Sequence, residues 1–398
     1  MLRKISVLLV VSLVLNGCSE SSVNQDVVLK NDGRIDTIII KRTDEKNGLS
    51  IDDSLNAMAN LMSGIKDSNS MYDFIKSSED FNEFSKNFDK RWTTFDSTRL
   101  SDLRKFRNNE ISKLINSQST LFYPFSGPDI LHAQTFFPDA QQYVLIGLEP
   151  VGALPDFHKQ DTSFLKPYFK KINSSLNAIL NFSFFRTESM KNDLKNEEVD
   201  GTLHLLFLFL KRTGSQLSSA KPVTIDEKGQ LEFLASFSEL KKINNPVKGV
   251  EIQFVDKDLN NKKLYYYSLN AADGALNTNE GFMTYLNGLG TINTYLKGAS
   301  YLMHKSYFSL IRNVILNQSQ HVIQDDSGIA YRYFINNKQT WKFDLFGQYE
   351  KPIRMFSNCY QADLDSLYKK QGSKPTGFGI GYNFKDKNSN LLIATIQK

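Results

Sequence analysis

Two short segments carry the side chains best suited to acid–base or binding chemistry. The first begins at Ser126 and places Asp129 three residues before His132. On a helix this spacing puts both side chains on one face, where they can share a proton or a ligand. A structural interpretation is also open, because Pro128 after a serine is typical of a capped helix start.

The second segment contains the adjacent pair Asp325 and Asp326, within residues 321–328. Neighbouring carboxylates repel each other, so the fold must place a cation, basic side chains or backbone amides beside them. Arg332 and His304 are the candidate side-chain partners. A turn whose backbone amides bind the carboxylates is sufficient on its own to stabilise the pair. A metal ion or a substrate hydroxyl held by either aspartate is the functional alternative.

Glu149 is the third candidate. It follows an apolar run at 143–148, which predicts a buried strand, and it precedes Pro150. Binding residues often follow strand ends in α/β layers, although a purely structural acid is the alternative. The candidate acid–base residues are therefore Asp129, His132, His304, Asp325 and Asp326, and the candidate binding residues are Ser126, Asp129, Glu149, Asp325, Asp326 and Arg332.

Familiar catalytic motifs are missing from the sequence. It has no Gly-x-Ser-x-Gly, no phosphate-binding loop of the Walker kind and no His-Glu-x-x-His. The five histidines show no paired ligand spacing, and only two cysteines are present, so we expect neither a metal nor a cofactor. We expect Cys359 to be a buried, unreactive thiol.

Composition indicates a folded protein that does not bind nucleic acid. Of the 398 residues, 40% are hydrophobic and 23% charged, as in ordinary folded domains. The 48 basic residues exceed the 43 acidic ones by only five, which is too small a surplus for a nucleic-acid-binding surface.

The N-terminus has the pattern of an export signal. Arg3 and Lys4 precede an apolar stretch at 5–15, which is too short to span about 30 Å of hydrocarbon. The stretch ends Leu-Asn-Gly-Cys at residues 15–18, which resembles the lipobox of bacterial lipoproteins. The resemblance implies removal of residues 1–17 and acylation of Cys18, so the partner is a lipid bilayer. Ser19 implies the outer membrane, with the body on its periplasmic face.

The elements that position the candidate residues follow from periodicity. Residues 18–49 are polar and predict a tether, with one possible strand at 35–40. We expect an α+β body over 50–398: a helical N-terminal region, then a mixed, largely antiparallel sheet with packed helices. Two packed lobes with a boundary near 215–245 are also compatible. Helices are expected after a cap at Ser50 and at 71–88, 98–115, 164–184, 190–196, 203–210, 280–286, 291–317 and 362–369; strands are expected at 221–234, 250–269, 331–335, 341–346, 379–384 and 391–395.

Four sequence patterns in the body resemble a group of uncharacterised exported proteins of Gram-negative bacteria. They lie at 123–129, 147–152, 299–304 and 324–329. The resemblance implies relatives but no activity. We therefore expect an envelope lipoprotein whose body binds a ligand or a partner. The alternatives are an envelope hydrolase with an Asp/His acid–base pair, and a structural factor that only docks another protein.

Overall fold

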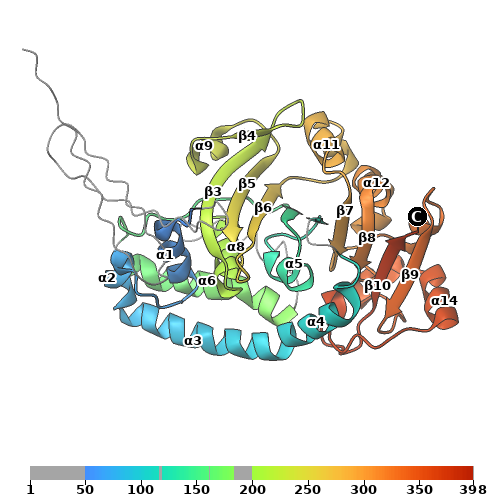
Figure 1. The fold of residues 1–398 in the computed structure, drawn as a ribbon, viewed down its shortest axis with the longest axis horizontal. Helices are drawn as coiled ribbons and strands as arrows, with labels where there is room; N and C mark the ends of the chain where they lie inside the picture. The colour runs from blue at the N-terminus through green and yellow to red at the C-terminus, as the bar shows by residue number, and fades with distance from the viewer. Residues whose placement is uncertain (1–49, 116–118, 161, 183–199, 398) are drawn as a thin grey trace, which may run out of the picture.

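The protein is described by a computed structural model that places residues 50–115, 119–160, 162–182 and 200–397 (Figure 1). The export signal, Cys18, the tether with its possible strand at 35–40, and the helix expected at 190–196 lie outside these residues.

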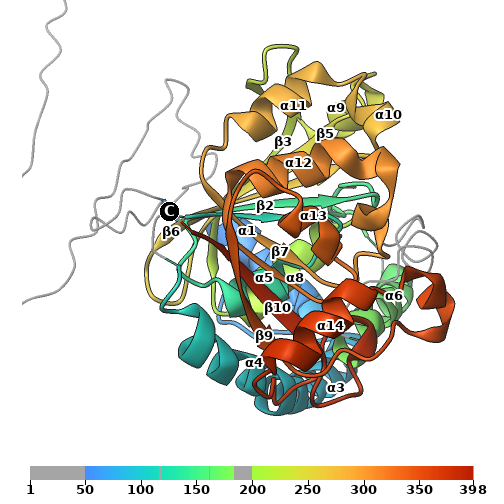
Figure 2. The same cartoon turned by 90° about the vertical axis from the view of Figure 1, so that its right-hand side faces the viewer.

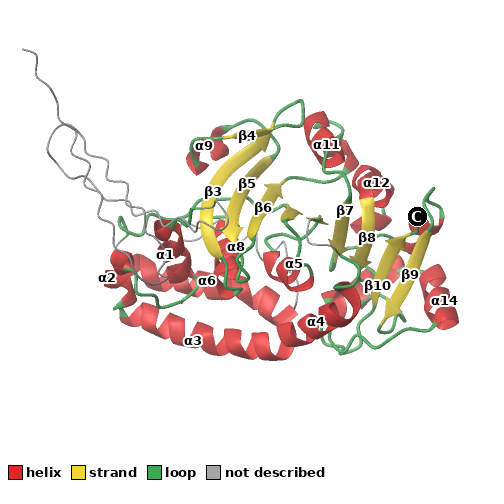
Figure 3. Ribbon diagram, viewed as in Figure 1, coloured by secondary structure: helices red, strands yellow, loops and turns green. Residues whose placement is uncertain are grey.

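The described strands form one ten-stranded sheet (Figure 3). Its order is β4-β3-β5-β6-β2-β1-β7-β8-β10-β9, so strands on both sides of residues 215–245 share the same sheet. The strands are β1 (Thr120–Tyr123), β2 (Gln142–Gly147), β3 (Gln216–Ile225), β4 (Leu231–Phe233), β5 (Lys248–Val255), β6 (Asn261–Ser268), β7 (Ile292–Leu296), β8 (Ser319–Gln324), β9 (Trp341–Phe346) and β10 (Leu391–Ile396).

The sheet combines a parallel centre with antiparallel flanks. The five strands β6-β2-β1-β7-β8 run parallel, whereas five of the nine neighbouring pairs are antiparallel and lie outside this centre. The expected α+β fold with a mixed sheet is confirmed. The parallel centre matters for function, because parallel strands bring their carboxyl ends to a single edge.

Helices cover both faces of the sheet. On one face lie α1, α3, α5, α6 and α8, and on the other lie α11, α12 and α14, as Figure 2 shows for α11 and α12 against α3 and α4. The α-helices are α1 (Asp53–Met62), α2 (Asp73–Lys76), α3 (Glu79–Phe95), α4 (Ser101–Phe106), α5 (Ile130–Phe136), α6 (Thr162–Phe182), α8 (Leu203–Arg212), α9 (Phe237–Lys242), α10 (Asp273–Leu276), α11 (Glu280–Asn287), α12 (Ser309–Gln318), α13 (Tyr331–Ile335) and α14 (Ala362–Gln371).

Side chains alternate between the two faces along the central strands. Tyr266 belongs to the core with α8, whereas its neighbours Tyr265 and Tyr267 belong to the core with α11 and α12. Buried apolar residues on both faces are typical of a covered sheet. The most apolar helix, α8, is also the most deeply buried, as the sequence predicts: its residues 203–210 are all 0% exposed.

Several predicted elements are wrong. Residues 291–317 are not one helix: β7 comes first and only Ser309–Gln318 is α-helical. Residues 331–335 form helix α13 instead of a strand, and 379–384 contain only the 3-10 turn η7 (Gly381–Asn383). The N-cap of α1 is Asp52 instead of Ser50, because its carboxylate accepts from the Leu55 amide.

Candidate functional site

Ionisable side chains follow four neighbouring strands at the carboxyl edge of the parallel centre. Glu149 follows β2, Asp129 follows β1, Lys297 follows β7, and Asp325 and its neighbour Asp326 follow β8. Each of these five residues is at most 4% exposed. Helix α5 after β1 covers one face and α12 after β7 covers the other, so the chain changes direction between β1 and β7. In open parallel sheets this switch point is where ligands bind.

Asp129 is the centre of this edge. It is the N-cap of α5, and its Oδ1 accepts from the His132 amide at 3.2 Å and from His132 Nδ1 at 2.9 Å. Its Oδ2 accepts from Tyr123 OH at 3.0 Å and from Lys297 Nζ at 2.8 Å. A carboxylate has about four acceptor sites, so the contacts of Asp129 are complete. Asp129 therefore joins β1 to β7 and orients His132.

The charges of Asp129, His132 and Lys297 determine which of these side chains are ionised. Burial alone would raise the pKa of Asp129, but His132 and Lys297 lower it to about 2. Burial lowers the pKa of His132 and of Lys297, and the Asp129 charge opposes this fall in both. Asp129 is consequently ionised at neutral pH, and the proton on His132 Nδ1 points at it.

The paired aspartates are held mainly by amides and hydroxyls. Asp325 accepts from the Gly298 amide at 2.8 Å, from the Ser327 amide at 3.0 Å and from the Ser327 hydroxyl. Asp326 accepts from Tyr301 OH at 2.5 Å and from Asn390 Nδ2 at 3.1 Å. Burial, and then repulsion by Asp325, raises the pKa of Asp326 to about 7.

Glu149 differs from the other acids of this edge. Its side chain is buried, and neither carboxylate oxygen accepts a well-aligned hydrogen bond within the described part of the chain, although the Tyr266 hydroxyl lies close enough to interact with it. A Cβ added to Gly147 would lie 2.6 Å from Glu149 Oε2 and 2.9 Å from Gly127 Cα, so the carboxylate lies beside the loop that carries Asp129. The nearby Tyr266 hydroxyl donates to the Glu149 carbonyl at 2.8 Å.

The remaining candidates border the edge. Ser126 is buried and its hydroxyl donates to the Gly127 carbonyl at 2.8 Å. His304 lies in the 3-10 turn η4 (Leu302–His304), where burial lowers its pKa to about 4. Arg332 is exposed and donates to the His304 carbonyl at 3.1 Å instead of to the paired aspartates.

Sequence reasoning missed Lys297, because residues 291–317 were assigned to one helix. A strand at 292–296 followed by Lys-Gly was the signal that could have revealed it. Asn390 and Tyr301 were also missed: they reach Asp326 from 64 and 25 residues away, and such separations leave no local pattern.

Comparisons with known proteins do not assign this chain to a family. No protein family, no curated protein and no solved structure shows a significant match to this chain. None of the helices in the described ranges is long and apolar enough to cross a bilayer. Among the same residues, no three His, Cys, Asp or Glu side chains are arranged to hold a metal ion.

Proposed function

We propose that this protein is a lipid-anchored envelope protein whose body binds a small, positively charged ligand at the carboxyl edge of its parallel strands. The observation that carries the binding proposal is the buried, unpartnered carboxylate of Glu149. A carboxylate removed from water without a partner destabilises a fold by several kcal/mol, so such a group is retained where a ligand completes it.

The neighbours of Glu149 favour an amine or a guanidine over an anion. Asp129, Asp325 and Asp326 lie along the same edge, and Lys297 is already bound to Asp129. Ser126 and Tyr266 could accept hydrogen bonds from hydroxyl groups on the same ligand. An amino sugar or a short diamine has this combination of charge and donors.

A thermal-shift titration of the full-length protein in detergent tests the binding proposal. The probes are glucosamine, putrescine and arginine, with glucose and sodium chloride as uncharged and ionic controls. A probe at a hundred times its Kd adds about 2.7 kcal/mol to stability. We expect a shift with at least one amine, and we expect Glu149→Gln to abolish it.

Asp273→Asn is the matched control variant. Asp273 accepts from the Ser309 and Leu310 amides at the start of α12, so its loss lowers stability without changing the site. It should retain the amine-dependent shift. Amine binding that survives in Glu149→Gln, or no amine binding at all, would overturn the proposal.

Acylation of Cys18 is tested separately. Growth with an alkyne-labelled fatty acid should label the wild type and leave Cys18→Ala unlabelled. Membrane fractionation should place the labelled protein in the outer membrane. Label on Cys18→Ala would contradict the anchor.

A hydrolase is the second candidate. It is favoured by Asp326, whose pKa of about 7 suits an acid or base near neutral pH. His132, oriented by Asp129, is the other available base. A screen of chromogenic esters and glycosides should then find an activity that both Asp326→Asn and His132→Gln remove.

A further inference from the structure

We infer that a cavity at the opposite, amino edge of the parallel strands binds a small organic anion, a site separate from the proposed amine site. The cavity has a volume of about 300 Å³, at the lower end of the range for ligand pockets. Its walls come from the helical segment 92–107, the end of α5, the end of α8 and the turn between β5 and β6.

The arginine side chains of the cavity carry the argument. Arg104 is paired with Asp96 at 2.7 Å, and Arg212 is paired with Asp89 at 2.5 Å. Arg107 has no ion pair within 4 Å among the described residues, and its buried Nε has no hydrogen-bond partner there. A guanidinium group left with unsatisfied donors is suited to a carboxylate or a phosphate, which it can bind through two parallel hydrogen bonds.

Two irregular helical turns contribute side chains to the wall of the cavity. The π-helical segments η2 (Asp96–Leu100) and η3 (Arg107–Ile111) flank α4, and together they supply Asp96, Leu100 and Arg107 to the cavity. A π-helical turn inserts an extra residue and is frequent at functional sites. Three of the residues that line the cavity therefore lie in irregular helical turns.

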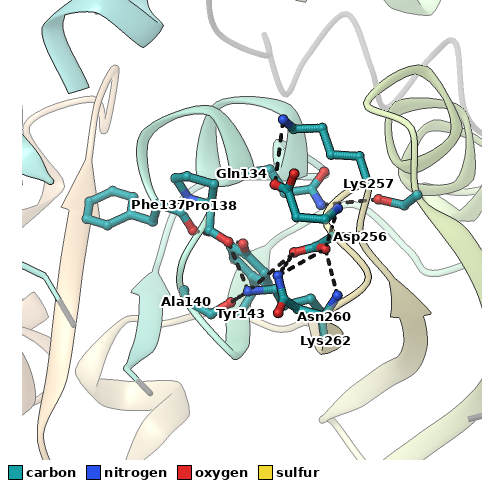
Figure 4. Close-up of polar contacts among 11 residues, drawn as sticks. Gln134, Phe137, Pro138, Ala140, Tyr143, Asp256, Lys257, Asn260 and Lys262 are labelled. Carbon is teal, nitrogen blue, oxygen red and sulfur yellow. Dashed lines mark hydrogen bonds and ion pairs between the residues drawn. The ribbon is translucent and has the colours of Figure 1, made fainter. Parts of the chain in front are cut away.

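The opposite wall is held by polar contacts between the β5–β6 turn and the segment before β2, as Figure 4 shows. The buried Lys262 ammonium donates to the Pro138 and Ala140 carbonyls, each at 2.9 Å, and lies 3.5 Å from Asp256 Oδ2. Asp256 Oδ1 accepts from the Asn260 amide at 2.9 Å. Asp256 is consequently occupied by its own turn and does not neutralise Arg107.

The ligand must also have an apolar part. Trp92, Leu100 and Pro138 line the same cavity, whereas the nearby Lys257 is paired with Asp258, another lining residue, at 3.5 Å. A volume of about 300 Å³ equals about ten water molecules, which suits a small molecule. An aromatic or branched carboxylate, or a small phosphate monoester, fits this description.

Calorimetric titration of the full-length protein in detergent tests the inference. The probes are sodium benzoate and inorganic phosphate at matched ionic strength, which distinguish a carboxylate from a phosphate. Trp92 fluorescence in a Trp341→Phe background gives a second readout, because the chain contains only these two tryptophans. We expect saturable binding of at least one anion, and a change in Trp92 emission.

Substitutions at Arg107 and at the nearby Lys105 test whether the anion binds in this cavity. Arg107→Gln should raise the Kd at least about tenfold, equivalent to about 1.4 kcal/mol, and Arg107→Lys should raise it less. Lys105→Gln removes the same charge from an exposed position outside the cavity and should leave the Kd unchanged. Glu149→Gln should also leave the Kd for the anion unchanged. The experiment therefore tests the anion site independently of the proposed amine site.

Two results would overturn the inference. One is no saturable binding of either anion up to about 10 mM. The other is binding that Arg107→Gln does not weaken, provided that this variant melts at the wild-type temperature.

Discussion

Individual acids at the carboxyl edge differ in how completely they are partnered. Asp129 binds four donors from three residues, whereas the Glu149 carboxylate has beside it only the Tyr266 hydroxyl, which donates to the Glu149 carbonyl. A completely partnered buried charge is a structural element, and removing one partner leaves a charge uncompensated. Removing the partners of Asp129 should therefore lower the free energy of unfolding, whereas replacing Glu149 should not lower it.

Replacing Lys297 tests the structural role of Asp129. Lys297→Met leaves the Asp129 carboxylate buried beside Tyr123 and His132 only, so we expect a loss of about 3–5 kcal/mol of unfolding free energy in urea. Lys342→Met removes a lysine from an exposed pair with Asp344 and should lose less than about 1 kcal/mol. Equal losses in the two variants would contradict the role assigned to Asp129.

Asp326 gives the edge a pH dependence. Its pKa is raised to about 7 in the folded protein, so folding favours its protonated form, and this stabilisation is lost as the pH rises through about 7. Between about pH 5 and pH 8 the wild type should lose about 2.7 kcal/mol more than Asp326→Asn. The measurement is urea unfolding of both proteins across that range, and parallel pH profiles would contradict the assignment.

At the scale of elements, periodicity predicted the helices better than the strands. Helices with one apolar face or all-round apolarity, such as α6 and α8, carry their own signal over many residues. Strands β7 and β8 contain polar residues such as Asn293, Thr294 and His321, so they lack the continuous apolar run that marks β2, and β7 was merged with the following helix. Burial of β7 comes from β1 and β8, which are distant in sequence.

The same limit applies to the candidate site. Asp129, His132, Glu149 and the paired aspartates were predicted, because turn residues and strand ends mark them locally. Lys297 could not be placed without β7, and the unpartnered state of Glu149 depends on packing between β2, β6 and the loop after β1.

The segment after β2 is fixed by a close backbone approach. A Cβ on Gly201, whose φ is +79°, would lie 2.4 Å from the Gly152 nitrogen. Gly201→Ala should therefore lose more than about 4 kcal/mol in urea unfolding. Gly290→Ala is the control: Gly290 has a similar φ of +71° and no atom near its Cβ position, so it should lose only about 1–2 kcal/mol. Equal losses would show that the close approach is unimportant.

At the scale of the whole molecule, the sheet separates two charged regions. The carboxyl edge contains four buried acids and Lys297, and the amino edge contains the cavity with Arg107. An amine ligand and an anionic ligand could bind these edges independently.

Equilibrium unfolding of Glu149→Gln, with and without glucosamine or putrescine, tests the central claim most directly. Without ligand the variant should be at least as stable as the wild type, because a buried carboxylate without a well-aligned hydrogen bond has been replaced. With the amine, only the wild type should gain stability. A variant that is less stable than the wild type by more than about 1 kcal/mol, or that gains as much from the amine, would contradict the assignment of Glu149 as the ligand contact.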